Sequence, residues 1–190
     1  RFQHLAAAAH GALAFGASYA FVYTAEGLIT SAIVAVAFAS MALMNLVMFR
    51  VVERQTASRS VWIGAGLGAL GVAVMSGGEI FGADLSPTMA LGVALSLMAA
   101  VVSTGGNYFA WRGQQKGTNV LPGTAWAMAY GSAGLLLFGL ATGVHWSLAL
   151  TPTYLGSLLY LAVFGSVIAF ALYLNLGRSH GYTLASYIGA

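Results

Sequence analysis

The 190-residue sequence contains no cysteine and very little charge. Without cysteine, the chain forms no disulfide and has no thiolate metal site. Only 6% of the residues are charged, compared with about a quarter in soluble domains. The few Lys and Arg residues are not interleaved with nucleic-acid-binding motifs, so no nucleic-acid partner is expected. Nothing in the residues indicates a cofactor or a metal site.

Long apolar runs take the place of the missing charge, since 59% of the residues are hydrophobic and the mean hydropathy is +0.85. Most runs reach the roughly 20 residues that a helix needs to cross about 30 Å of hydrocarbon. The sequence therefore predicts an all-α, polytopic transmembrane helix bundle. Its predicted helices are Leu5–Tyr23, Leu28–Phe49, Val61–Ser76, Met89–Trp111, Leu121–Thr142, Tyr154–Leu176 and a last one from Tyr182 onward.

The basic residues are sorted by connection. If Arg1 starts on the cytoplasmic side, every other Lys and Arg falls in a connection on that side. The opposite connections contain acidic residues and a histidine but no Lys or Arg. The positive-inside rule therefore predicts a multi-pass protein of the cell's inner membrane, with its basic loops cytoplasmic and the lipid bilayer as a partner. The basic connections contain Arg50, Arg54 and Arg59, then Arg112 and Lys116, then Arg178.

A weak internal similarity predicts two repeats. Tyr19–Tyr23 resembles Phe170–Tyr173, and the predicted topology runs these two segments in opposite directions. Similar segments of opposite direction are typical of inverted-repeat secondary transporters. We therefore predict two inverted five-helix repeats, both incomplete in a chain expected to be a fragment. Residues 1–76 would end the first repeat, residues 77–87 would form an external linker, and residues 88–190 would begin the second.

Four stretches resemble the ten-helix drug/metabolite transporter superfamily, specifically its EamA-domain members, over roughly helices three to nine. The chain departs from that family at Ala42, where Pro is common, and at Arg50, where Gly is usual. The resemblance implies a secondary transporter, not an enzyme, that exports small metabolites such as amino acids or related amphipathic compounds by alternating access. The stretches are Phe49–Arg54, Trp62–Val72, Gly106–Arg112 and Tyr154–Val167.

Polar side chains inside the predicted spans should face the bundle or a cavity, because lipid leaves them unsatisfied. Ser96, Ser103 and Asn107 are spaced by seven and four residues, so they share one helix face. They either form interhelical hydrogen bonds or line a substrate site. The histidine of the first span binds a proton or substrate, or reaches a polar partner or the interface. The predicted substrate-binding residues are His10, Ser18, Ser103, Asn107, Tyr160 and Phe164.

Two other functions stay open from the sequence. Gly16-Ala17-Ser18 is a Gly-x-Ser fragment, so an intramembrane serine hydrolase would use Ser18 as its nucleophile with His145 or His180 as the base. A non-transporting membrane scaffold or sensor is the other alternative, and it predicts that changes on the cavity face have no effect.

A stripe of glycines on one predicted helix has two interpretations. Gly64, Gly68 and Gly71 form a small-residue stripe, which lets a second helix approach closely. The partner is either a neighbouring helix of the same chain or a second copy in a homodimer.

Overall fold

The computed structural model of this chain describes residues 2–77, 82, 86–144, 150–169, 171, 172 and 175. These residues form helices and no strand, which confirms the predicted all-α class. Within them, four helices are long and apolar enough to cross a membrane, and two further apolar helices are shorter. The last predicted helix, from Tyr182 onward, lies outside the described residues. The four long helices are Phe2–Glu26, Ser31–Val52, Pro87–Gln115 and Val120–Ala141.

Two of the helices change their winding along their length. The first consists of α1 (Phe2–His10), a π-helical segment η1 (Gly11–Ala17) and α2 (Ser18–Glu26). The second is α9 (Pro152–Tyr160), which continues as another π-helical segment, η2 (Leu161–Ile168). It is one of the two shorter apolar helices, and the other is α5 (Arg59–Met75). The others are α3 (Ser31–Ala39) with α4 (Met41–Val52), α7 (Pro87–Gln115) and α8 (Val120–Ala141).

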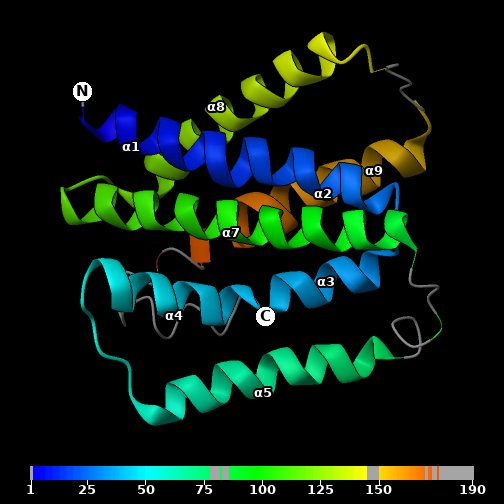
Figure 1. Cartoon of the computed structure of the whole chain (residues 1–190). Coiled ribbons are helices and arrows are strands. Elements are labelled where there is room, and N and C mark those ends of the chain that lie inside the picture. Colours follow the sequence, from blue (N-terminus) through cyan, green and yellow to red (C-terminus); the bar gives the residue numbers. More distant parts are fainter. Residues whose placement is uncertain are drawn as a thin grey trace.

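Helix α7 is central to the packing. It contacts α1, η1 and α2 on one side and α3 and α4 on the other, while α8 packs against η1. Successive helices alternate in direction, so the connections 53–58 and 116–119 lie at the same end of the bundle as the N-terminus (Figure 1). The α9–η2 helix runs opposite to the first helix, as an inverted repeat requires (Figure 1). The repeat itself stays a prediction.

The crossing of the first helix and α8 depends on glycine. A Cβ atom on Gly11 would lie 2.1 Å from the carbonyl oxygen of Ala127, and one on Gly131 would lie 2.4 Å from the Cβ of Phe15. Small residues thus bring the two backbones into direct contact. This close crossing holds η1 against the middle of α8.

The glycine stripe of α5 behaves differently. A Cβ atom on Gly68 or Gly71 would have no described atom within 4 Å. Packing within the chain, the first interpretation of this stripe, is therefore not seen at these two positions. A homodimer through this face stays a prediction.

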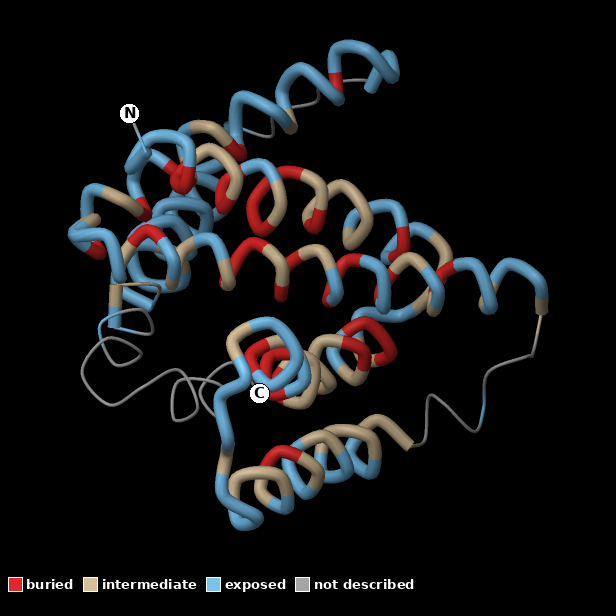
Figure 2. The backbone as a smooth tube through the Cα atoms, turned by 60° about the vertical axis from the view of Figure 1, so that its left-hand side comes forward, coloured by how far each residue is buried: buried red, intermediate tan, exposed pale blue. Residues whose placement is uncertain are grey.

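Much of the apolar surface is exposed on the outer helices, and the buried residues gather where the first helix, α7, α3 and α4 meet (Figure 2). Leu67 on α5 is 62% exposed, and Leu159 on α9 is 66% exposed. A contiguous apolar surface of this kind is what a lipid environment covers. The exposure of α5 and α9 therefore agrees with a membrane-embedded bundle.

Candidate functional site: a pocket beside His10 of the first helix

His10 ends α1 and is buried, with 3% of its surface exposed. Its Nε2 atom has no hydrogen-bond partner among the described residues. The ring lies against Phe15, with centroids 5.1 Å apart. A buried polar atom without a partner costs about 1–3 kcal/mol, so an unpaired imidazole nitrogen at such a position indicates a site for a ligand or a water molecule.

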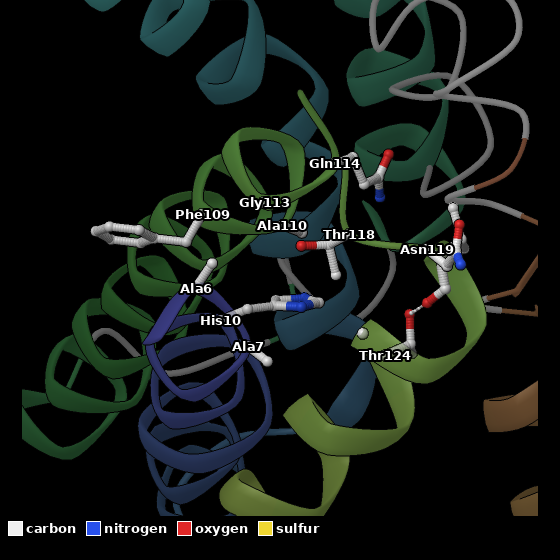
Figure 3. Close-up of a pocket in the computed structure, with 12 residues that line it drawn as sticks. Ala6, Ala7, His10, Phe109, Ala110, Gly113, Gln114, Thr118, Asn119 and Thr124 are labelled. Carbon is white, nitrogen blue, oxygen red and sulfur yellow. Dashed lines mark hydrogen bonds between the residues drawn. The ribbon is translucent and has the colours of Figure 1, made fainter. Parts of the chain in front are cut away.

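The His10 side chain points into a small pocket between α1, the end of α7 and the start of α8 (Figure 3). We name it the His10 pocket. It leaves about 20 Å³ for the centres of water molecules, and roughly 10–15 Å³ is enough to hold one. Oγ1 of Thr118 is a second buried atom without a partner in the described part of the chain, and it lines the same pocket. The lining residues are Ala6, Ala7, His10, Phe109, Ala110, Gly113, Gln114, Thr118, Asn119, Val120, Gly123 and Thr124.

A tight turn brings the start of α8 to this pocket. Gly117 has φ +86°, a left-handed conformation that glycine adopts without strain. The Thr118 N–H donates to the Gly113 carbonyl at 3.0 Å, which closes the end of α7. Asn119 then begins α8 in extended conformation, and its side chain makes no capping hydrogen bond. The first backbone N–H groups of α8 are therefore left uncapped by Asn119.

A second pocket adjoins the first, because both are lined by Ala7, Thr118, Asn119 and Gly123. We name it the His4 pocket, and it leaves about 160 Å³ for water centres. Its remaining lining residues are Gln3, His4, Gly117, Pro122 and Trp126.

Aromatic side chains make one wall of the His4 pocket. The His4 ring meets Trp126 edge-on with centroids 5.0 Å apart, and Trp126 stacks on Tyr130 at 5.8 Å. Nδ1 of His4 lies 3.2 Å from the Tyr130 hydroxyl, within hydrogen-bond distance. The His10 pocket thus contains the two unpartnered polar atoms, and the adjoining His4 pocket adds aromatic surface.

Among the predicted site residues, Ser18 has a clear structural partner. It is fully buried and donates a 3.0 Å hydrogen bond to the carbonyl oxygen of Ala99 on α7. A serine hydroxyl held in this way joins two helices. The bases proposed for a hydrolase, His145 and His180, lie outside the described residues.

The polar stripe of α7 is buried as one face, as its spacing predicts, with Ser103 at 9% and Asn107 at 5% exposure. Ser96 does not bond across helices, because its hydroxyl donates to the Gly92 carbonyl of its own helix at 2.9 Å. Neither Ser103 nor Asn107 is among the residues that line the His10 or the His4 pocket.

Tyr160 and Phe164 lie apart from the two pockets, on α9 and η2. Their rings stack with centroids 5.0 Å apart. Their side chains are 62% and 54% exposed, so neither packs into a core of the described bundle. Of the six residues predicted from the sequence, only His10 lines the pocket described above.

Four polar residues of the His10 pocket are absent from the set predicted from the sequence: Gln114, Thr118, Asn119 and Thr124. A local signal exists for Thr118 and Asn119, because Gly-Thr-Asn directly before an apolar run marks the end of one helix and the N-cap of the next. That signal gives the helix boundary, whereas the approach of His10 from another helix depends on the tertiary crossing.

Comparison with known proteins found no relative of this chain. No family model, no curated protein and no solved structure matches this chain. The resemblance to EamA-domain transporters therefore remains an expectation from the sequence.

Proposed function

We propose that this protein is a secondary transporter that moves small amphipathic metabolites, such as amino acids, across the inner membrane by alternating access. The observation that carries the proposal is the His10 pocket, in which two buried polar atoms have no partner among the described residues. Its walls come from three of the four helices that are long and apolar enough to span a membrane. Polar side chains that face a cavity between such helices are typical of a solute pathway.

The chemistry of the two pockets suits an amphipathic solute. His10 and Thr118 offer hydrogen bonds in the His10 pocket, and Trp126 offers an aromatic surface in the adjoining His4 pocket. Both pockets are lined by the 116–119 connection, which the charge pattern predicts to be cytoplasmic. A solute would therefore enter from the cytoplasm, in agreement with export.

The two π-helical segments support the inverted-repeat part of the proposal. Segment η1 follows α1, and η2 follows α9. Both contain a Phe-Gly pair, Phe15-Gly16 and Phe164-Gly165. π-Helical turns occur frequently at functional sites. Matching segments in two helices of opposite direction are what related repeats would give.

The two alternatives make different demands on the described residues. A hydrolase needs a free nucleophile, but the Ser18 hydroxyl donates to a backbone carbonyl. A scaffold or sensor needs no solute pathway, so obstruction of the His10 pocket would leave it unaffected. Obstruction of the His10 pocket therefore distinguishes a transporter from a scaffold or sensor.

The test is uptake of tritiated amino acids, beginning with L-phenylalanine, by inside-out vesicles from cells that overproduce the protein. Gly123 lines both pockets, so Gly123→Leu should obstruct them and abolish uptake. The matched control is Ala125→Leu on the exposed face of the same helix, which should transport normally. Failure of every amino acid to accumulate above control vesicles would overturn the proposed function. Normal uptake by Gly123→Leu would remove the pocket from the pathway.

A further inference from the structure

We propose that the His10 pocket binds the carboxylate of the transported solute, with the rest of the solute in the His4 pocket. This inference rests on the proposed function and specifies its substrate class as organic acids, including amino acids. The juxtaposition that carries it is the uncapped start of α8 beside the unpaired Nε2 of His10.

The start of α8 supplies the first part of an anion site. A helix of 22 residues has a partial positive charge at its N-terminus, where backbone N–H groups lack intrahelical acceptors. The Asn119 side chain accepts no hydrogen bond from them. Pro122 has no N–H, so the groups of Val120 and Leu121 are the ones available in the first turn.

His10 supplies the second part, independently of the helix terminus. The residue is 3% exposed, and its ring points into the pocket toward the 118–124 segment (Figure 3). Nε2 donates when it carries the proton of the neutral ring. The Thr118 hydroxyl is also a donor, and its oxygen has no described partner. Two side-chain donors from different elements thus meet at one helix N-terminus.

The distribution of charge selects an acid over an amine. The residues that line the two pockets include no Asp and no Glu, so a carboxylate there meets no like charge and an ammonium group finds no counter-ion. The nearby Lys116 belongs to the same turn and carries a positive charge. An anionic group is therefore the one that this end of the bundle stabilises.

The sizes of the two pockets fix the orientation of the solute. The His10 pocket leaves about 20 Å³ for water centres, enough for one or two small polar atoms but not for a hydrocarbon body. The His4 pocket leaves about 160 Å³ and has Trp126 in its wall. The carboxylate would therefore point inward, with an apolar or aromatic group against Trp126.

The experiment compares an acid with its neutral amide on the purified protein. Calorimetric titration would use 3-phenylpropionate and 3-phenylpropionamide, which have nearly the same shape, with 2-phenylethylamine as the cationic probe. The acid should bind at least tenfold more tightly than the amide, and the amine should bind most weakly. Removal of one donor to a charged group weakens binding on the order of tenfold to a hundredfold. Thr118→Val and His10→Leu should therefore each reduce the affinity for the acid by that factor and reduce the affinity for the amide less, because hydrogen bonds to a neutral carbonyl are weaker.

The control is Thr142→Val, at the far end of α8, where the hydroxyl donates to the carbonyl of Phe138. It should bind the acid normally. If His10→Leu does not fold, Thr118→Val, which keeps the shape of the side chain, decides the outcome. Equal binding of acid and amide, an acid preference that survives both substitutions, or equally strong competition by inorganic phosphate would overturn the inference. Each of these results leaves transport itself intact, whereas failure of transport is measured separately in the vesicles.

Discussion

Tyr108 donates a 2.6 Å hydrogen bond to Oε1 of Glu53 and so joins the ends of two helices at the basic end of the bundle. Arg112 donates to the same Tyr108 hydroxyl at 3.2 Å, and its guanidinium carbon lies 5.7 Å from the ring centroid. The ring of Phe49 packs edge-on against Tyr108 with centroids 6.1 Å apart. The acid that ends α4 thus has a defined partner on α7, the central helix.

This bond should contribute measurable stability. Loss of one hydrogen bond at a partly exposed site costs about 1 kcal/mol. We expect Tyr108→Phe to lower the unfolding free energy of the detergent-solubilised protein by that amount. A double-mutant cycle with Glu53→Ala should show a coupling of similar size, because each substitution removes the same bond. Strictly additive effects of the two substitutions would show that the bond contributes nothing.

The glycine crossing predicts a sharp contrast between two positions of α8. Gly131→Ala would bring its Cβ within 2.4 Å of the Cβ of Phe15, so the first helix must shift. We expect a loss of about 1–3 kcal/mol, as for other over-packed sites. Gly134 lies one turn later, where a Cβ meets no described atom within 4 Å. Gly134→Ala should be neutral or stabilising, since alanine favours a helix over glycine. Thermal unfolding of the two variants side by side checks the contrast, and equal stability would contradict this crossing.

The positions of the helices are predictable from the sequence because hydropathy over a span-length window is a local property. The predicted Leu5–Tyr23 lies within Phe2–Glu26, and the predicted Leu121–Thr142 almost coincides with α8. Which helices touch is not local. The contact of Gly11 with Ala127 depends on the angle at which two helices cross, and no stripe of small residues in one helix specifies its partner.

The same distinction between local and non-local information explains which residues of the pocket could be predicted from the sequence. His10 is conspicuous in the sequence as a polar residue in an apolar span, so it can be singled out as a candidate. Thr118 and Asn119 look like an ordinary connection, and they line the same pocket only because α8 crosses the first helix beside His10. The change to π-helical winding at Gly11 is also hidden, since it leaves the hydropathy of the span unchanged.

Ser18→Ala separates a structural serine from a catalytic one. Its hydroxyl bonds the Ala99 carbonyl, and interhelical bonds of this kind contribute about 0.6 kcal/mol in membrane bundles. We expect a loss of stability of that order with transport retained. Ser96→Ala is a suitable comparison, because that hydroxyl bonds within its own helix. Abolished transport by a folded Ser18→Ala protein would contradict a purely structural role and return Ser18 to the predicted substrate-binding residues.

The predicted substrate contacts outside the pocket can be tested in the same vesicles. Asn107 is buried on the polar face of α7, and Tyr160 stacks on Phe164. If a solute passes these residues during transport, Asn107→Leu and Tyr160→Ala should lower the uptake rate without reducing expression. Ser132→Ala, an exposed position on α8, is a control that should leave uptake unchanged. Unchanged transport in the first two variants would remove these residues from the site.

Membrane orientation can be tested by cysteine labelling, because the native chain has no cysteine to interfere. Glu26 and Lys116 are both exposed, at the end of the first helix and just after α7. The positive-inside rule places Lys116 in the cytoplasm and Glu26 outside. A membrane-impermeant maleimide should therefore label Glu26→Cys in intact cells and Lys116→Cys only after permeabilisation. The unsubstituted protein should stay unlabelled in both cases. Labelling of both positions from the same side would mean that the first helix and α7 do not cross the bilayer as opposed spans, and the solute entry assigned to the 116–119 connection would lose its basis.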